Sequence, residues 1–500
     1  MIKHIIERGI FMKEKEKKKS ITEIVSSIVE NTKCFISQEK IVFAEIEKKG
    51  KPIIVPIDGE VFKNYLLYKI FTEEQKINTE VINHIILLIK AKAQYDGETI
   101  ITANRIGAKK GIFYYDLAKE ENKYICITSK GYKIVQESPV IFTRKSILSP
   151  QVLPKENENY SLWELKKYFN IINEEDFTLL LVHIISCFIP NTSHHILIFL
   201  GNQGSAKTTA CRFIKQIVDP STIDISAMPR GKEDLILQIS SSYMTVFDNI
   251  NRLKEEYNDI FCQLVTGGNF IKRKLYTDSD IVAYSLQCCL ILNGINYLTN
   301  QPDLLDRSIV IPLKKISSCD RKTEQELSAQ FKKELPYILH CIFQTVSQAK
   351  KIHKDIQVEN LPRMADAVKW YCAIAEALDI DNTDFLKIYH RNREQINQEL
   401  LSENITAYAL IQFMLCKPKW KGAVSELWEK LKNIIEQKGI SINQPSWAKS
   451  SSALSRQLNK LKVNLEEAGI YFHITNIGNY KQISLESKKG VIQNEVKKHN

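Results

Sequence analysis

The feature that most constrains this chain is a glycine-rich turn between an apolar run at residues 195–200 and a segment of helical periodicity at residues 207–217. Such a turn points successive backbone N–H groups inward, and the helix that follows adds its positive N-terminal end. The pattern therefore predicts a strand, an anion-binding turn and a helix. The residues concerned are Gly201, Gly204, Ser205, Ala206, Lys207, Thr208 and Thr209.

The side chains after the turn predict that the anion is a nucleoside triphosphate. Lys207 can reach the β- and γ-phosphates, and the Thr208 hydroxyl can ligate Mg²⁺. The usual pattern has a glycine before the lysine, where this chain has Ala206. The alternative is an ordinary strand–turn–helix connection, which this combination of residues disfavours. We therefore expect ATP and Mg²⁺ as cofactors.

A second apolar run, at residues 243–247, ends in Asp248. A carboxylate at the end of a strand near the glycine-rich turn would hold the Mg²⁺ shell together with Thr208. Many ATPases place a glutamate next, which polarises the attacking water, but this chain has Asn249. Because an amide can orient a water and cannot take its proton, the catalytic base stays unassigned.

Asn293 ends a third apolar run, at residues 288–292. We expect this strand to lie beside the one that ends in Asp248. The Asn293 amide could then sense the γ-phosphate and help to orient water. The alternative is an asparagine that starts a turn before Gly294, and the order and spacing of the motifs favour the functional role.

Arg307 stands immediately before a fourth apolar run, at residues 308–312. An arginine here could reach the γ-phosphate of a neighbouring subunit and stabilise charge in the transition state. The alternative is a surface salt bridge with Asp306 or Asp303. The finger role is favoured, and it would make activity depend on assembly.

The consecutive cations Lys272, Arg273 and Lys274 precede a turn-prone segment and a strand. A hairpin at this position would project into the central pore of a ring, where its cations would contact the phosphates of a single strand regardless of sequence. A solvated, charged strand edge explains the same pattern equally well.

The stretch of residues 201–313 resembles the AAA+ ATPases of phages and integrated mobile elements. The shared motifs are the Gly-Ser-Ala-Lys loop, the Asp248–Asn249 strand end, Thr266-Gly267-Gly268, Arg273–Asp278, the Asn293–Gly294 strand end and the Asp306–Arg307 pair. The alanine-containing loop is also similar to that of minichromosome-maintenance helicases, and the short span from the loop to Arg307 is similar to superfamily 3 helicases. The resemblance extends upstream to residues 112–117.

This resemblance implies an AAA+ fold, assembly into a ring, and work on DNA. We expect an ATP-dependent DNA helicase or translocase of a phage or mobile element, which assembles as a homo-oligomer, most simply a hexamer. The alternative is a nucleotide-dependent switch that loads or regulates without unwinding, which the amide of Asn249 slightly favours. A small-molecule kinase on the same loop is a weaker candidate because no lid arginines or acceptor site are recognisable.

Composition shifts divide the chain into segments. We expect a flexible basic lead-in at 1–20, a mixed α+β N-terminal domain of unassigned role at 21–155, an α/β core with a parallel sheet at 160–315, a helical region at 316–400 and a small unit at 405–490. In the N-terminal domain, short strands surround one amphipathic helix at about residues 78–95. Strands alternating with helices are typical of a parallel sheet covered on its faces.

The small unit reads as helices at residues 407–415, 424–437 and 451–468, followed by two strands around Gly478. This order resembles the winged-helix DNA-binding domains, which place a helix in the groove of duplex DNA. Its basic residues include Arg456, Lys460 and Lys462. Since winged helices also mediate protein contacts, both roles stay open.

The bulk composition agrees with a nucleic-acid partner, which the net charge of +11 permits and does not require. The eleven cysteines form no CxxC pair, which argues for a reducing compartment. No apolar run is long enough to cross a membrane, and the N-terminus lacks a secretory pattern. We expect a cytoplasmic protein with no membrane partner. His194 and His195 are interpreted as a strand-entry pair because no further metal ligands at suitable spacing are evident.

Overall fold

The computed structural model describes residues 20–38, 40–48, 50–72, 79–273, 281–285, 288–299, 301–317, 319, 321–359, 362–478 and 480–488, apart from the side chains of 51, 269–273 and 281–285. These residues form two compact units. The first takes its residues from 1–109 and 138–143, and the second from 110–137 and 144–500. The expected N-terminal domain at 21–155 thus spans parts of both units, and the predicted domain boundaries stay predictions.

The first unit combines a mixed sheet, in the order β3-β2-β1-β4, with helices α1 to α3. Its elements are α1 (Ile21–Asn31), β1 (Cys34–Ser37), β2 (Val42–Lys48), β3 (Lys51–Pro56), α2 (Glu60–Thr72), α3 (Thr79–Asp96), β4 (Glu98–Ile100), β5 (Thr102–Ala103), β6 (Ile106–Lys109) and β10 (Ile141–Phe142).

The prediction of a single helix in this region is wrong, because α2 accompanies α3. Phe62 and Leu66 of α2 are fully buried, but Tyr68 and Phe71 of the same helix are exposed. Apolar residues therefore surround α2 instead of forming one stripe, and the helical period is hidden in the sequence.

The second unit is built on a parallel sheet in the order β12-β13-β16-β11-β17. The strands are β11 (Ile196–Leu200), β12 (Ser226–Ala227), β13 (Met244–Asp248), β16 (Cys289–Gly294) and β17 (Ser308–Pro312). Both faces of β11 and β16 are buried, as expected for strands of a covered parallel sheet. Because β16 lies between β11 and β13, the predicted neighbourhood of the strands ending in Asn293 and Asp248 is confirmed.

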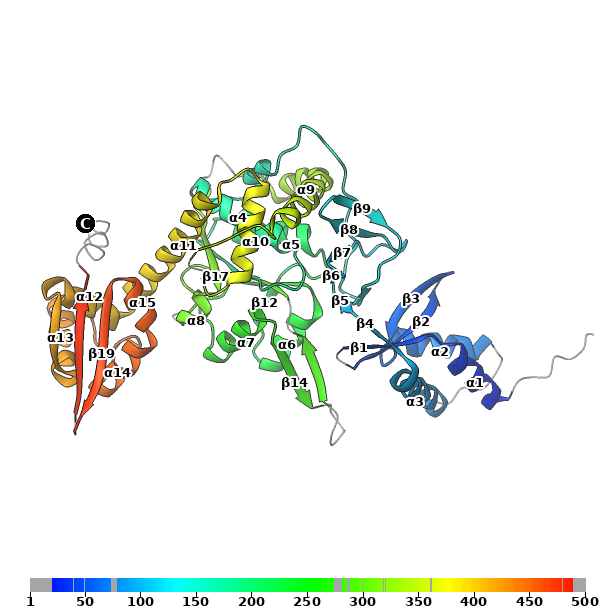
Figure 1. Cartoon of the computed structure of the whole chain (residues 1–500), viewed down its shortest axis with the longest axis horizontal. Coiled ribbons are helices and arrows are strands. Elements are labelled where there is room, and N and C mark those ends of the chain that lie inside the picture. The colour runs from blue at the N-terminus through cyan, green and yellow to red at the C-terminus, as the bar shows by residue number, and fades with distance from the viewer. Residues whose placement is uncertain are drawn as a thin grey trace, which may run out of the picture. The chain divides into compact units, whose positions relative to one another are not determined.

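Helices cover this sheet, in the green and yellow part of Figure 1. Helix α4 contacts β17, α5 contacts β13 and β16, and α6 contacts β13. The remaining elements of this region are η1 (Leu162–Tyr168), α4 (Glu174–Ser186), α5 (Lys207–Val218), α6 (Lys232–Ser241), α7 (Glu255–Val265), β14 (Asn269–Arg273), β15 (Ile281–Ser285), α8 (Pro302–Leu305), α9 (Glu324–Ile352), α10 (Ala365–Ala377) and α11 (Asn382–Glu403). The predicted helical character of residues 322–400 is confirmed.

An antiparallel group packs against the end of α5, formed by β7 (Ile112–Asp116), β8 (Tyr124–Thr128) and β9 (Gly131–Val135). The Tyr115 hydroxyl donates to the Val218 carbonyl at 3.1 Å, and Gln151 Nε2 donates to the Gln216 and Ile217 carbonyls. These contacts explain why residues 110–137 belong to the second unit.

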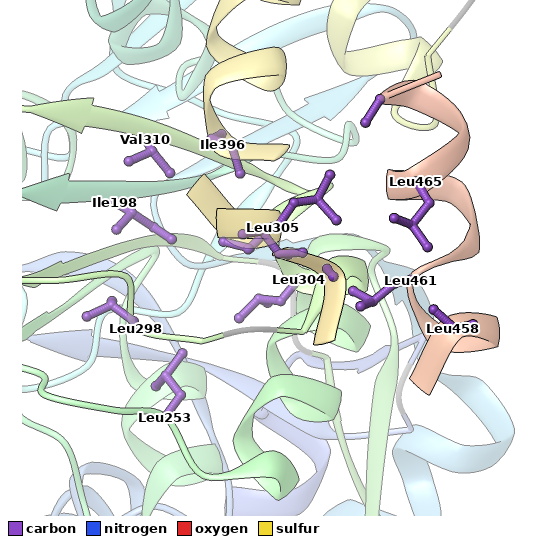
Figure 2. Close-up of a cluster of buried hydrophobic side chains, with 14 of the residues drawn as sticks. Ile198, Leu253, Leu298, Leu304, Leu305, Val310, Ile396, Leu458, Leu461 and Leu465 are labelled. Atoms are coloured by element: carbon purple, nitrogen blue, oxygen red, sulfur yellow. The ribbon is translucent and has the colours of Figure 1, made fainter. Parts of the chain in front are cut away.

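The C-terminal part contains α12 (Ile405–Cys416), β18 (Lys419–Ala423), α13 (Val424–Gln437), α14 (Ser451–Lys460), α15 (Lys462–Glu467), β19 (Ile470–Ile477) and β20 (Tyr480–Ser487), with the antiparallel strand order β18-β20-β19. The predicted helix at 451–468 is interrupted at Leu461, and β18 was not predicted. Leu461 faces the core in both halves of the break, so the apolar spacing continues across it. Figure 2 shows Leu458, Leu461 and Leu465 in the same apolar cluster as Leu304 and Leu305 of α8.

Among the described helices, none is both long enough and apolar enough to cross a membrane.

Candidate functional site

The glycine-rich turn follows β11 and delivers the chain into α5. Gly204 has φ +83° and Ala206 has φ +61°, so both stand in the left-handed region. That conformation costs a residue with a Cβ about 1 kcal/mol or more, which explains why the usual pattern has glycine at the position of Ala206. A Cβ on Gly201 would lie 2.7 Å from the Leu313 carbonyl oxygen, so this position is closed to larger residues.

The ammonium group of Lys207 lies across the turn. Its Nζ donates to the carbonyl oxygens of Gly201 at 2.6 Å and Asn202 at 3.1 Å. Partial burial lowers the pKa of Lys207, while the nearby Asp248 carboxylate opposes that shift. The lysine is thus held at the mouth of the turn by carbonyl groups, which are weaker partners than a phosphate.

Thr208 and Asp248 meet although they come from different elements. The Thr208 hydroxyl donates to Asp248 Oδ2 at 3.0 Å and lies 3.3 Å from Oδ1. Both residues are partly exposed. A hydroxyl and a carboxylate at this spacing form one side of an oxygen-ligand set for Mg²⁺, which keeps several waters and takes few protein ligands. The residues therefore fit the predicted ion.

Asn293 is completely buried, and both ends of its amide are engaged. Its Oδ1 accepts from the Asn249 backbone N–H at 2.9 Å, and its Nδ2 donates to Cys211 Sγ at 3.4 Å. Asn249 has φ +55°, a left-handed conformation that asparagine tolerates better than most residues. Asn293 thus holds the backbone directly after Asp248, a positioning contact that sequence reasoning did not anticipate.

Arg307 is nearly buried and pairs with Asp303. Its Nη1 also donates to the Asp303 carbonyl oxygen at 2.8 Å. Burial acts to raise the pKa of Asp303, but the hydrogen bond from Arg307 outweighs it and lowers that pKa to about 2. In the isolated chain Arg307 therefore occupies the salt bridge considered as its alternative role.

Two further arginines join this cluster, and the sequence did not single them out. Arg363 lies 2.5 Å from Asp303 Oδ1 and is half-exposed, and Arg393 Nη2 donates to Asp306 Oδ1 at 2.6 Å. A third arginine, Arg321, approaches the glycine-rich turn: its Nη2 is 3.5 Å from the point where a Cβ on Gly204 would stand. Only their positions in space reveal these residues, since they lie far from the motifs along the chain.

The expected cationic hairpin is present as a backbone feature. β14 and β15 pair antiparallel, with Lys272 opposite Val282 and Arg273 opposite Ile281. The side chains of Lys272 and Arg273 and the whole of Lys274 lie outside the described residues. Contacts of these cations with DNA therefore stay a prediction.

Two family models match the chain. Residues 162–398 match that of the actinomycete integrative conjugative element replication protein, and residues 406–495 match that of the AICE RepA C-terminal domain. No curated protein matches the sequence.

Among solved structures, one described as "SCCmec type IV Cch - active helicase" shares 11% identity at a TM-score of 0.46, over 92% of this chain and 93% of that chain. Another, the apo A form of the NrS-1 C-terminal region, shares 12% identity at a TM-score of 0.43, over 94% of this chain and 100% of that chain. Both similarities are distant.

Proposed function

From the premise that this chain belongs to the replication proteins of integrative conjugative elements, we propose that it is an ATP-driven DNA helicase or translocase with an AAA+ P-loop core. It would act in the replication of a phage or mobile element. The observation that carries the proposal is the contact between the Thr208 hydroxyl and the Asp248 carboxylate, directly beside Lys207.

Bound ATP with Mg²⁺ would supply the phosphoanhydride bond whose hydrolysis drives movement. The backbone N–H groups of the turn and the N-terminus of α5 would bind the phosphates. Thr208 and Asp248 would hold the metal shell, and Lys207 would leave the Gly201 and Asn202 carbonyls for the phosphates. Asn293 would keep the Asn249 backbone in place, so that the Asn249 amide could orient the attacking water.

An Asp248→Asn variant tests this carrying observation. It keeps a hydrogen-bond acceptor for Thr208 but removes the charge that faces the metal. We expect ATP turnover to fall about 10²-fold and the Mg²⁺ concentration for half-maximal activity to rise. Asp224→Asn, at an acid between α5 and β12, is the control and should leave both quantities unchanged. Equal turnover in Asp248→Asn and the parent would contradict the proposed site.

We also propose that Arg307 acts across a subunit interface in a hexameric ring. The pair with Asp303 would hold the guanidinium in a fixed position until a neighbouring subunit offers a more negative partner. A mixing experiment tests this idea. Lys207→Met lacks a working ATP site but keeps Arg307, whereas Arg307→Ala has the opposite defect. Each variant alone should be nearly inactive, because an arginine finger contributes about 10³–10⁵-fold to turnover.

A mixture of the two variants should regain activity, since some interfaces then combine an intact site with an intact arginine. Lack of any recovery, with mixed assembly shown by sizing, would assign Arg307 to its own subunit or to a structural salt bridge. Arg363→Ala is the matched control from the same cluster, and it should retain turnover if Arg307 alone is the finger.

DNA would run through the centre of the ring past the β14–β15 hairpin. Alanine at Lys272, Arg273 and Lys274 should abolish the stimulation of ATP turnover by single-stranded DNA and leave basal turnover unchanged. The C-terminal part, which we propose to be a winged helix, would contact duplex DNA through exposed Arg456, Lys460 and Lys462.

The second candidate is a nucleotide-dependent switch that binds DNA without unwinding it. The presence of the amide Asn249 at a position where many ATPases have a glutamate favours slow hydrolysis. A strand-displacement assay separates the two: the helicase releases a labelled strand in proportion to ATP consumed, and the switch binds the same fork without release.

A further inference from the structure

A buried cluster of thiol and imidazole groups lies at the edge of the parallel sheet where the strands begin. Cys187 follows the last residue of α4, His194 precedes β11, and Cys289 is the first residue of β16. One potential ligand atom from each of the three lies within 4.8 Å of the other two. All three residues are buried.

A second histidine stands beside this group. His183 precedes Cys187 by one helical turn, so both project from the same face of α4. His183 Nε2 lies 3.9 Å from Cys187 Sγ, while its Nδ1 contacts the Tyr371 hydroxyl at 2.8 Å. An imidazole whose second nitrogen is fixed by a hydroxyl or carbonyl is the usual arrangement of a histidine that ligates a metal.

The imidazole of His194 lacks adequate partners within the described part of the chain. Its Nδ1 has no hydrogen-bond partner, and its Nε2 is 3.4 Å from the Tyr243 hydroxyl, a long contact. Leaving a buried polar atom unpaired costs about 1–3 kcal/mol. His195, the next residue, differs: both of its ring nitrogens contact tyrosine hydroxyls, at 3.1 Å and 3.0 Å. The polar network of this region therefore satisfies one histidine of the pair and leaves the other short of partners.

We propose that Cys187, His194 and Cys289 bind a zinc ion, with His183 as the fourth ligand. Two thiolates and two imidazoles form a tetrahedral set typical of structural zinc, and four protein ligands leave no open position for a substrate. The ion would connect the end of α4 to the starts of β11 and β16. It would act on stability, since the nucleotide-binding residues lie at the opposite ends of these strands.

The main competing explanation is a disulfide between Cys187 and Cys289, and the bland one is a packed group of thiols and imidazoles without a ligand. A disulfide accounts for the two cysteines but requires neither histidine. Convergence of two histidines on the same pair of sulfurs favours the metal.

Metal analysis of the purified full-length chain tests the proposal. Protein prepared in reducing, chelator-free buffer should carry about one zinc ion per chain. Cys289→Ser should lose most of this zinc. Cys288→Ser is a matched control at the neighbouring buried position: Cys288 shares an apolar cluster with Leu290 and Leu292, which excludes Cys289. The control should retain its zinc, and equal loss in both variants would overturn the assignment.

Cobalt substitution of the unmutated chain keeps the test valid if the variants fold poorly. Chains refolded or expressed with Co²⁺ should show the intense near-ultraviolet and visible absorption of cobalt bound to thiolates in a tetrahedral site. Removal of zinc by a chelator should also lower the melting temperature of the unmutated chain. Absence of zinc together with absence of the cobalt spectrum overturns the proposal, and so does a Cys187–Cys289 disulfide in the reduced preparation. None of these readouts depends on ATP turnover.

Discussion

The two edges of the parallel sheet differ in how they treat charge. At the edge where the strands end, Lys207, Thr208 and Asp248 are partly exposed and are held by few contacts. At the edge where the strands begin, polar groups are buried and joined to several partners. Lys215 pairs with Asp219 there at 3.0 Å, and Asp219 accepts from the backbone N–H groups of Tyr243 and Met244.

This difference indicates a division of labour along one helix and one sheet. Groups at the open edge can exchange their present partners for a charged ligand at little cost. Groups at the closed edge cannot, because an unpaired buried charge is far more costly than an exposed one. Substitutions at the open edge should therefore change activity, and those at the closed edge should change stability.

The largest expected effect is that of Lys207→Met, at the first residue of α5. We expect turnover of ATP per unit of enzyme and substrate to fall about 10³-fold or more, since the ammonium faces the phosphates. Phosphate release and thermal melting measured on the same sample check the prediction. The melting temperature should stay close to that of the parent, and a large drop would erase the contrast between the edges.

Lys215→Met, two turns further along α5, should give the opposite result. Methionine fits the apolar stem of the lysine, but Asp219 is left as a buried charge without its cation. The free energy of unfolding should fall by about 3–5 kcal/mol, as is typical when one partner of a buried pair is removed. Denaturant titration measures the loss, and the double variant with Asp219→Asn should recover part of it.

Arg321→Ala concerns a residue near the turn that no motif identified. If its guanidinium contacts the bound phosphates, we expect ATP affinity to fall about tenfold with no change in stability. Titration with a fluorescent ATP analogue gives the dissociation constant. Lys322→Ala removes an exposed cation of the adjacent residue and serves as the control, so equal losses would point to a general charge effect.

The smallest effect concerns Asp176 in the first turn of α4, the helix that ends at Cys187. Burial raises the pKa of Asp176 to about 6, although the Asn173 side chain opposes this shift. Because the folded state binds this proton more tightly, stability should decrease as pH rises from about 4 through about 6. Asp176→Asn should lack this contribution, so its stability relative to the parent should rise by about 1–2 kcal/mol over that range. Denaturant titrations at pH 4.5 and 7 would check it, and parallel pH profiles would contradict it.

Much of the core could be predicted from the sequence, because strands buried on both faces read as uninterrupted apolar runs. The runs ending near Leu200, Asp248 and Asn293 all form strands within a residue or two of the predicted bounds. Elements whose exposed faces carry apolar or small residues were missed, among them α2 and the short strand β18. Their stability comes from packing against neighbours, which a local pattern does not report.

The candidate site divides in the same way. The meeting of Thr208 with Asp248 follows from strand ends that converge at one edge of a parallel sheet, so the motif order was sufficient to predict it. The contact of Asn293 with the Asn249 backbone and the pairing of Arg307 with Asp303 depend on rotamers and loop conformations. A lone arginine before a strand fits a trans-acting role and a salt bridge equally well until its surroundings are known.

Taken by itself, the amino-acid sequence determined the turn that enters α5, the acid that ends β13 and the periodicity of the surrounding helices. These are local properties, since backbone preferences and apolar spacing act over a few residues. The tertiary structure decided that β16 lies between β11 and β13, that three distant arginines gather around two aspartates and the turn, and that Cys187, His194 and Cys289 converge. Each of these arrangements joins residues far apart in the chain, and only the packing of whole elements brings them within contact distance.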